Sequence, residues 1–383
     1  MNLNNLQQVF EHYIDRFDYI NDSENQEYYK WQVCQEYPVL MKKALSADDE
    51  CFSDALKDVK KCTFNLIDSY TQPFGGLVDF ARTEPGVVRG LFKDLYADDG
   101  GDLKIRMEKI EDFFKHADDQ LNRLMPESHL YKQNSHSVSA YLFLNDPDNH
   151  YMYKAVQSQR FADCIEFYDD WGSGENIRLD VYHRMCDELV VAINDCRELL
   201  ETHESRFDGR LKLSGGELHP DKNKHILAFD LIYCCSVYDL FDGITYTKRN
   251  MKEKQLYLAE KAKAQSLKEE FERAKTDADL LEEAIECFVN MINPGDKILH
   301  RKYGEGIVNS VDFKTIDATY SEGQKSISLP MGIGCGILKA ESPDFDEKLN
   351  KYMEILRKYD KIRGRLEMAA RALEPYDDYL DTL

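Results

Sequence analysis

Residues 294–340 read PGDKILHRKYGEGIVNSVDFKTIDATYSEGQKSISLPMGIGCGILKA, in a chain whose other segments show mainly helical periodicity. Short runs rich in β-branched residues are separated here by glycines, a pattern typical of a small, strongly bent sheet. Glycine in the intervening turns allows positive φ angles. The pattern predicts four strands, over Lys297–His300, Gly306–Val311, Thr315–Tyr320 and Lys325–Leu329.

The segments on both sides of this β-rich stretch carry apolar stripes. Before it, apolar residues from Ala264 to Ile292 recur at alternating three- and four-residue intervals, which indicates a coiled-coil helix. After it, a second stripe runs from Phe345 to Leu373 and stops before Pro375. Each stripe needs an apolar partner, so we expect an antiparallel hairpin of the two helices with the β-rich segment at its tip. Homodimerisation through the first helix is the alternative.

The remaining sequence predicts a mostly α protein. Apolar residues recur at helical spacing through much of the N-terminal part, and only 151–153 suggests a short strand. The expected organisation is a helical domain over 1–245, a coiled-coil stalk helix over 246–293, a small SH3/Tudor-like β-barrel over 294–341, and a C-terminal stalk helix with a tail over 342–383.

Charge and cysteine content restrict the classes of function. The 383 residues include 71 acidic and 49 basic ones, giving a net charge of −22. Such a surface repels phosphate backbones, which argues against non-specific nucleic-acid binding but leaves room for a local basic patch. The ten cysteines show no paired spacing, as is typical of reduced thiols. Without a leader or a long apolar run, we expect a soluble cytoplasmic protein with no membrane association.

The spacing of glycines and aromatic residues within 294–340 follows the pattern H-x-x-[YF]-G-x-G-x-V and then x-G-x-K-x-[IL]-x-L. The positions that match are His300, Tyr303, Gly304, Gly306, Val308, Gly323, Lys325, Ile327 and Leu329. This pattern resembles the Tudor/SH3-like barrel at the C-terminus of UvrD-type helicases. In those helicases the barrel contacts other proteins, RNA polymerase among them, and in some cases nucleic acid. The resemblance implies a docking module, and a rigid spacer without a ligand is the alternative.

Three residues of this segment are candidates for partner binding. Tyr303 lies in the expected tight turn 302–305, where Gly304 should leave the ring near the surface. Arg301 and Lys325 are among the few cations of the segment and suit an acidic or phosphate-bearing partner. The alternative is that Tyr303 plugs one end of the barrel and serves stability alone.

A second set of short motifs lies in the N-terminal part. It comprises Glu27-x-x-Lys30-Trp31, Leu91-Phe92-x-x-Leu95-Tyr96, Ser139-x-Tyr141-Leu142, Pro147, Tyr151-x-Tyr153-Lys154 and the segment His225–Tyr233. These motifs resemble the helical N-terminal regions of restriction-type AAA+ proteins related to the McrB GTPase. The chain has no G-x-x-x-x-G-K-[ST] motif, so the nucleotide-driven motor of those proteins is missing. The resemblance therefore implies only a region for target recognition or partner contact.

Within that region, Tyr141, Tyr151 and Tyr153 with Lys154 are candidates for a stacking or cation–π surface. The alternative is ordinary core packing of a strand on helices. Neither H-E-x-x-H nor G-x-S-x-G occurs in the chain, and no histidine lies beside a cysteine pair. We therefore predict no catalytic residue, no metal and no cofactor.

The sequence as a whole favours a non-enzymatic adaptor or recognition subunit of a bacterial defence system, restriction-like in kind, or of a DNA-transaction system. The expected partner is a protein bound through the small barrel, with a separate motor or nuclease subunit and RNA polymerase as candidates. The alternatives are a nucleic-acid-binding module for modified or single-stranded DNA, and an unrecognised nuclease.

Overall fold

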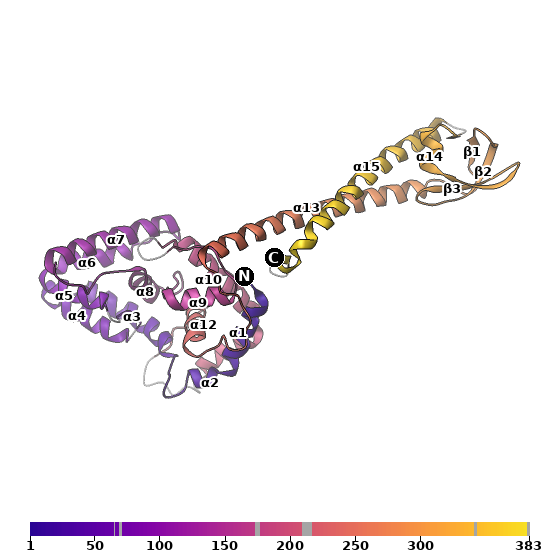
Figure 1. The fold of residues 1–383 in the computed structure, drawn as a ribbon. Helices are drawn as coiled ribbons and strands as arrows, with labels where there is room; N and C mark the ends of the chain where they lie inside the picture. The colour runs from indigo at the N-terminus through magenta and orange to yellow at the C-terminus, as the bar shows by residue number, and fades with distance from the viewer. Residues whose placement is uncertain (65, 69–70, 173–176, 209–216, 341–342, 381–383) are drawn as a thin grey trace. The chain divides into compact units, whose positions relative to one another are not determined.

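The computed structural model describes residues 1–64, 66–68, 71–172, 177–208, 217–340 and 343–380. The chain divides into two compact units, Met1–Gln255 and Leu256–Leu383. The described part of the first unit is helical, whereas the second combines helices with a small antiparallel sheet (Figure 1). This confirms the prediction of a mostly α protein with one small β-module. Within the described residues, no helix is both long and apolar enough to cross a bilayer.

The first unit packs around one hydrophobic core. Its helices are α1 (Leu3–Asp15), α2 (Phe17–Ile20), α3 (Tyr29–Leu45), α4 (Asp49–Cys62), α5 (Pro73–Thr83), α6 (Pro85–Leu95), α7 (Leu103–Leu124), α8 (Ser135–Asn145), α9 (Ala155–Cys164), α10 (Leu179–Asp195), α11 (Arg197–Glu204), η2 (Ser205–Phe207) and α12 (His225–Val237).

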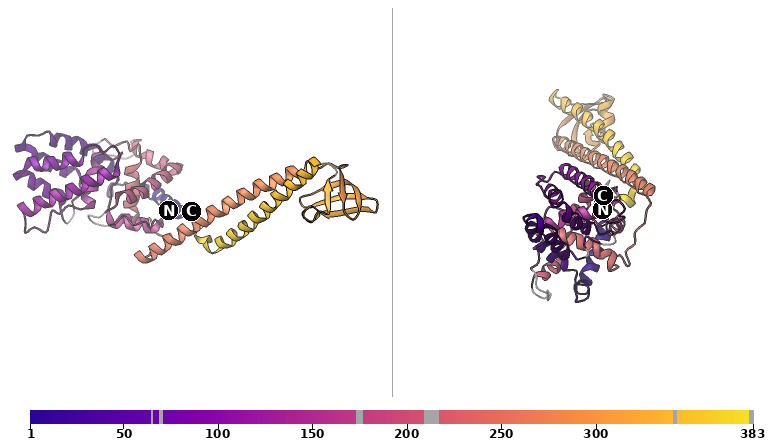
Figure 2. Two further views of the ribbon diagram at one scale, coloured as in Figure 1. Left: turned by 90° about the horizontal axis from the view of Figure 1, so that it is seen from above. Right: turned by 90° about the vertical axis from the view of Figure 1, so that its left-hand side faces the viewer.

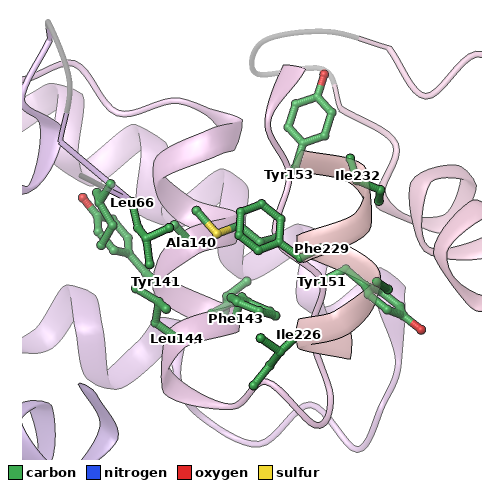
Figure 3. Packing of buried hydrophobic residues seen from close by; sticks show 14 of the residues in the cluster. Leu66, Ala140, Tyr141, Phe143, Leu144, Tyr151, Tyr153, Ile226, Phe229 and Ile232 are labelled. Atoms are coloured by element: carbon green, nitrogen blue, oxygen red, sulfur yellow. The ribbon is translucent and has the colours of Figure 1, made fainter. Parts of the chain in front are cut away.

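Helices α8 and α12 form the centre of this core because both are apolar around most of their circumference, as expected of buried helices. The rings of Phe143 on α8 and Phe229 on α12 meet edge to face, with centroids 5.6 Å apart (Figure 3). The segment 225–233, singled out in the sequence, is therefore an interior helix.

The strand predicted over 151–153 is wrong. These residues belong to an irregular connection between α8 and α9. Their backbone groups are satisfied by side chains instead of a neighbouring strand: the Tyr153 N–H donates to Ser139 Oγ (3.1 Å), and the Tyr182 hydroxyl donates to the Met152 carbonyl (2.7 Å). Side-chain partners can satisfy buried backbone groups as well as a ladder can, and sequence periodicity does not report them.

The second unit contains two long helices that lie side by side, with the sheet between them in chain order (Figures 1 and 2). Its helices are α13 (Met251–Val289), α14 (Leu329–Gly334), α15 (Pro343–Leu373), η3 (Glu374–Tyr376) and α16 (Asp377–Leu380), and α13 begins within the last residues of the first unit.

Side chains of the two predicted stripes meet between α13 and α15. The Phe288 ring stacks on Tyr352, with centroids 4.8 Å apart. Nearer the start of α13, the Tyr359 hydroxyl donates to the Glu282 carboxylate (3.4 Å). The later residue of α15 thus pairs with the earlier residue of α13, so the two helices run antiparallel. The apolar stripes have an intramolecular partner.

The sheet has five antiparallel strands in the order β4-β3-β2-β1-β5. They are β1 (Lys297–His300), β2 (Gly304–Val311), β3 (Thr315–Tyr320), β4 (Gly323–Ser328) and β5 (Leu338–Ala340). The sheet curls into a half-barrel, whose core joins residues such as Ile298 and Ile316 to Ile285 of α13 and Tyr352 of α15.

The sequence predicted the bounds of β1 and β3 as observed. Strands β2 and β4 each begin two positions earlier than expected, at Gly304 and Gly323, and β4 ends one position earlier, at Ser328. The residues after β4 form α14 and then β5, which the sequence analysis did not separate. The predicted barrel is an open half-barrel, because β4 and β5 are opposite edges of the sheet and do not pair in the described residues.

Candidate binding groove

The turn between β1 and β2 is held by a histidine. His300 Nδ1 accepts hydrogen bonds from the backbone N–H groups of Lys302 (3.1 Å) and Tyr303 (3.2 Å). Gly304 follows with φ +76°, a conformation that suits glycine. Only an unprotonated Nδ1 can accept these bonds. Burial, together with the positive charge of Lys302, lowers the pKa of His300 below its usual value, which keeps the ring neutral and the turn intact.

Three aromatic rings lie together beside this turn. The Tyr303 ring stacks on His300 with centroids 4.4 Å apart, and its centroid is 5.6 Å from that of Tyr320. Tyr320 is buried, and it lies over Gly306, where an added Cβ would come within 2.4 Å of the ring. Tyr303 is half-buried and packs against the core of the unit. The ring is partly packed, as the stability interpretation requires, and partly accessible, as the binding interpretation requires.

Cations surround the accessible part of Tyr303. The Nζ atoms of Lys302 and Lys325 lie 5.2 and 5.4 Å from the centre of its ring. Arg301 is exposed on the same turn. In the described ranges none of these three cations has an ion-pair partner, although the chain carries an excess of 22 negative charges. This corner of the second unit is therefore a local positive patch on an acidic protein.

A groove of about 730 Å³ opens next to this patch. It is lined by His300, Arg301, Lys302, Tyr303, Ser326, Ile327, Ser328, Met331, Gly332 and Ile337. One wall is the β1–β2 turn, another is strand β4, and the third is α14 with the residues that follow it. The side chains of Ile327, Met331 and Ile337 form the apolar part of the lining, and Met331 is 65% exposed. A concave apolar surface with a few polar groups at its rim is the usual form of a binding site.

Sequence reasoning found part of this groove. Of its predicted residues, Arg301 and Tyr303 line it, and Lys325 approaches Tyr303 from β4. It missed Met331 and Ile337, because both lie beyond the predicted strands and reach the groove only through the fold of α14. It also missed the role of His300, whose position in the matched pattern was the one available signal.

The three tyrosines predicted as a stacking surface in the first unit are core residues. Tyr141, Tyr151 and Tyr153 are 0%, 5% and 3% exposed (Figure 3). The Tyr141 hydroxyl donates to the buried Gln133, and the Tyr151 ring packs on His225 with centroids 4.0 Å apart. Buried rings cannot stack on an external base, so the alternative interpretation, core packing, describes this cluster.

Lys154 does take part in a cation–π contact, but with a different partner. Its Nζ lies 5.2 Å from the centre of the Tyr233 ring, on α12. Burial, and to a lesser degree repulsion from Lys30, lowers the pKa of Lys154 to about 8. The contact joins the α8–α9 connection to α12.

A buried network of charges in the first unit was not predicted. Asp230 on α12 accepts from Lys30 on α3 and from Arg206 in η2, and all three side chains are fully buried. Glu27 lies 2.9 Å from the Lys30 ammonium, and the Tyr13 hydroxyl donates to Asp230. Although burial by itself disfavours the charged form of Lys30, the neighbouring acidic groups, Asp230 first among them, together outweigh it and raise the pKa of the lysine. The network is neutral in sum.

This network explains two of the motifs in the N-terminal part. Glu27 and Lys30 of one motif meet Asp230 of another, which is the only acidic residue of α12. Buried ion pairs of this kind tie elements together when their partners are satisfied. These motif positions therefore have a structural role in joining α3 to α12.

A second hollow, of about 330 Å³, lies in the first unit near Asp98, Asp99, Asp146 and His150. The carboxylate of Asp99 already accepts hydrogen bonds from Arg106 at both oxygens (2.8 and 3.1 Å), so it is not free to bind a ligand. Across the described ranges, no group of three or more His, Cys, Asp or Glu side chains is placed to hold a metal ion. The groove in the second unit is the stronger candidate for a functional site.

Comparison of the chain with protein-family models, with curated proteins and with solved structures found no match.

Proposed function

We propose that this chain is a non-enzymatic adaptor or recognition subunit that binds a partner protein through the groove of its half-barrel. The observation that carries the proposal is the combination of an open groove, lined in part by the apolar side chains of Ile327, Met331 and Ile337, with three cations that have no ion-pair partner in the described residues, Arg301, Lys302 and Lys325. Unpaired cations beside an accessible apolar surface favour a partner that brings both negative charge and apolar side chains.

The two long helices support the same proposal. Paired as an antiparallel coiled coil, α13 and α15 would act as a stalk that carries the half-barrel inserted between them. The setting we propose, a restriction-like defence system or a DNA-transaction system, rests on the sequence resemblances alone. A separate motor or nuclease subunit and RNA polymerase are the partners to look for first.

Charge reversal in the groove tests the proposal. The double variant Arg301→Glu with Lys325→Glu should lose capture of the partner in pull-downs from the native host, because it places negative charge where an acidic segment would bind. The matched control is Lys351→Glu with Arg365→Glu on the exposed surface of α15, which changes the net charge equally. The control should capture the partner as the wild type does. Equal capture by all three proteins would contradict the proposal.

The alternative is binding of modified or single-stranded DNA by the same cations. A gel-shift series with single-stranded DNA at increasing salt separates the two, because phosphate contacts make affinity fall steeply with salt. We expect no shift at physiological salt. A salt-sensitive shift that disappears in the Arg301→Glu, Lys325→Glu variant would favour the nucleic-acid alternative instead.

A further inference from the structure

The half-barrel presents an unpaired strand edge to the groove described above. Strand β4 is the last strand of the sheet, so only one of its sides pairs with a neighbour, β3. From this edge we infer that the partner binds as an extended segment that adds to β4 as a sixth, antiparallel or parallel strand, and that this segment carries apolar side chains and, near one end, acidic ones. This inference rests on the proposed function and specifies how the partner is recognised.

The register of β3 and β4 shows which backbone groups are available. The two strands pair with Tyr320 opposite Gly323 and Thr315 opposite Ser328, without interruption. The Leu329 N–H donates to the Lys314 carbonyl (2.8 Å), so residues 314 and 329 are a hydrogen-bonded pair of the same ladder. Hydrogen-bonded and non-hydrogen-bonded pairs alternate along an antiparallel ladder.

It follows that Lys325 and Ile327 use their backbone groups to bond with β3. Gln324 and Ser326 direct their N–H and C=O groups away from β3, toward the free edge, and Ser328 adds its N–H, because its C=O is used as the N-cap of α14. Their side chains are exposed, as this alternation requires, whereas Lys325 and Ile327 are half-buried. The available groups span about 13 Å, at ~3.3 Å per residue, which suits a short added strand of about five residues.

The groove lies on the same side as this edge. Ser326 and Ser328 line it together with Met331 of α14 and Ile337. Natural proteins normally protect edge strands by charge, by proline or by a covering element, but the outward positions of β4 carry small or neutral side chains. An added strand would occupy the groove between β4 and α14 and would extend the half-barrel toward closure.

The cations beside the groove indicate that the added strand carries acidic residues. Lys325 points from β4 to the ring of Tyr303, where Lys302 also lies, and Arg301 stands on the wall opposite β4. Successive side chains of a strand point to opposite faces. Apolar residues on one face of the added strand would therefore meet Ile327 and Met331, while acidic residues near its end would meet the cations. Main-chain bonds of this kind give affinity, and the side-chain pockets give specificity.

The experiment uses a displayed library of random linear peptides selected on the full chain. We expect the selected peptides to combine apolar residues with Asp or Glu near one end. A synthetic copy of the best peptide is then measured by fluorescence anisotropy against the wild type and against Ser326→Pro and Ser326→Ala. Proline removes the outward N–H of residue 326 but none of the bonds to β3, and it is tolerated on edge strands. Affinity should fall at least about tenfold with proline and stay unchanged with alanine.

A second measurement leaves the protein unchanged. Backbone N-methylation of the peptide, one residue at a time, should weaken binding at every second position and have little effect at the positions between, because only alternate N–H groups face β4. This result would support strand addition even if Ser326→Pro failed to fold.

The remaining outcomes separate the two proposals. A flat N-methylation scan, with binding still lost in the Arg301→Glu, Lys325→Glu variant, would overturn strand addition and leave the proposed function standing. Selected peptides without acidic residues would overturn the partner chemistry. Self-association of the chain that Ser326→Pro abolishes would identify a second copy as the occupant. A peptide whose binding survives all of these changes would bind outside the groove and count against both proposals.

Discussion

Asp230 is buried between two cations, Lys30 and Arg206. Its negative charge offsets part of the free-energy cost of burying the two positive charges. Although burial by itself would raise the pKa of Asp230, the two cations hold it below its usual value. Sequence patterns could not predict this arrangement. Lysine and arginine are almost never fully buried unless they are paired, and the pairing here joins residues from three distant segments.

Asp230→Asn should therefore destabilise the first unit strongly. Removing one charge from a buried network leaves an uncompensated cation, at a cost of about 3–5 kcal/mol. Both tryptophans of the chain, Trp31 and Trp171, belong to the first unit. Urea unfolding followed by tryptophan fluorescence therefore reports this unit alone. The control is Asp54→Asn, on the exposed side of α4, which should unfold as the wild type does. Equal midpoints for both variants would contradict the assigned role of the network.

Buried and half-buried histidines predict a pH dependence of the same unit. Burial lowers the pKa of His136 to about 4 and those of His150, His183 and His203 to about 3, against 6.5 in the unfolded chain. Between these values the unfolded state binds more protons than the folded one, so stability is full above pH 6.5 and falls as the pH drops.

Between pH 7 and pH 5 the loss of stability should be on the order of 2 kcal/mol for each of these imidazoles, before most carboxylates titrate. Thermal unfolding followed by tryptophan fluorescence at the two pH values measures it. His183→Gln should flatten the profile, whereas His116→Gln, at an exposed position of α7, should leave it as in the wild type. A melting temperature that does not change down to pH 5 would show that the buried histidines are not neutral as described.

At the scale of elements, the sequence predicted where the strands of the half-barrel lie but not that the barrel stays open. The β-branched runs predicted the bounds of β1 and β3 to the residue. Each of these strands is followed by a turn whose glycine, Gly304 or Gly323, has a positive φ. The barrel stays open because of the segment that follows β4. After β4 the chain turns into α14 at Leu329, with Pro330 in the first helical turn, so the edge of β4 remains free. Local sequence propensity indicates this short helix only weakly. It does not indicate that the helix leaves the edge of β4 unpaired.

Gly306 should be indispensable for the half-barrel, for a reason other than its φ angle. It stands opposite Tyr320 on the neighbouring strand, and the tyrosine ring fills the space of the missing side chain. Gly306→Ala should cost about 1–3 kcal/mol through overpacking. Hydrogen exchange of residues 297–340, followed by mass spectrometry, should show faster exchange in the strands and no change in the first unit.

The control for this prediction is Gly364→Ala, at a position of α15 where an added Cβ meets no atom within 4 Å. It should leave exchange in the sheet unchanged and should favour the helix slightly. Unchanged exchange in Gly306→Ala would show that Tyr320 can move aside at little cost.

At the scale of the whole molecule, the sequence predicted a helical region followed by two apolar stripes around a β-module, and the structure contains these parts. The two long helices and the sheet belong to one compact unit, in which Ile285, Ile298 and Tyr352 share a core. The candidate groove belongs wholly to this second unit. Sequence alone placed the cations and Tyr303 in the right segment, but the groove itself depends on α14 and on the open edge of β4.

Site-specific photo-crosslinking in the native host tests the central claim, partner binding through the groove, most directly. A photoreactive residue replaces Met331, which lines the groove and is 65% exposed, and in a second strain it replaces Met368 on α15, which is 66% exposed. We predict that position 331 forms one dominant crosslink to another protein, that Arg301→Glu with Lys325→Glu abolishes it, and that position 368 forms none to the same protein. Crosslinks of equal yield and identity from both positions, or a crosslink at 331 that survives the charge reversal, would contradict the account.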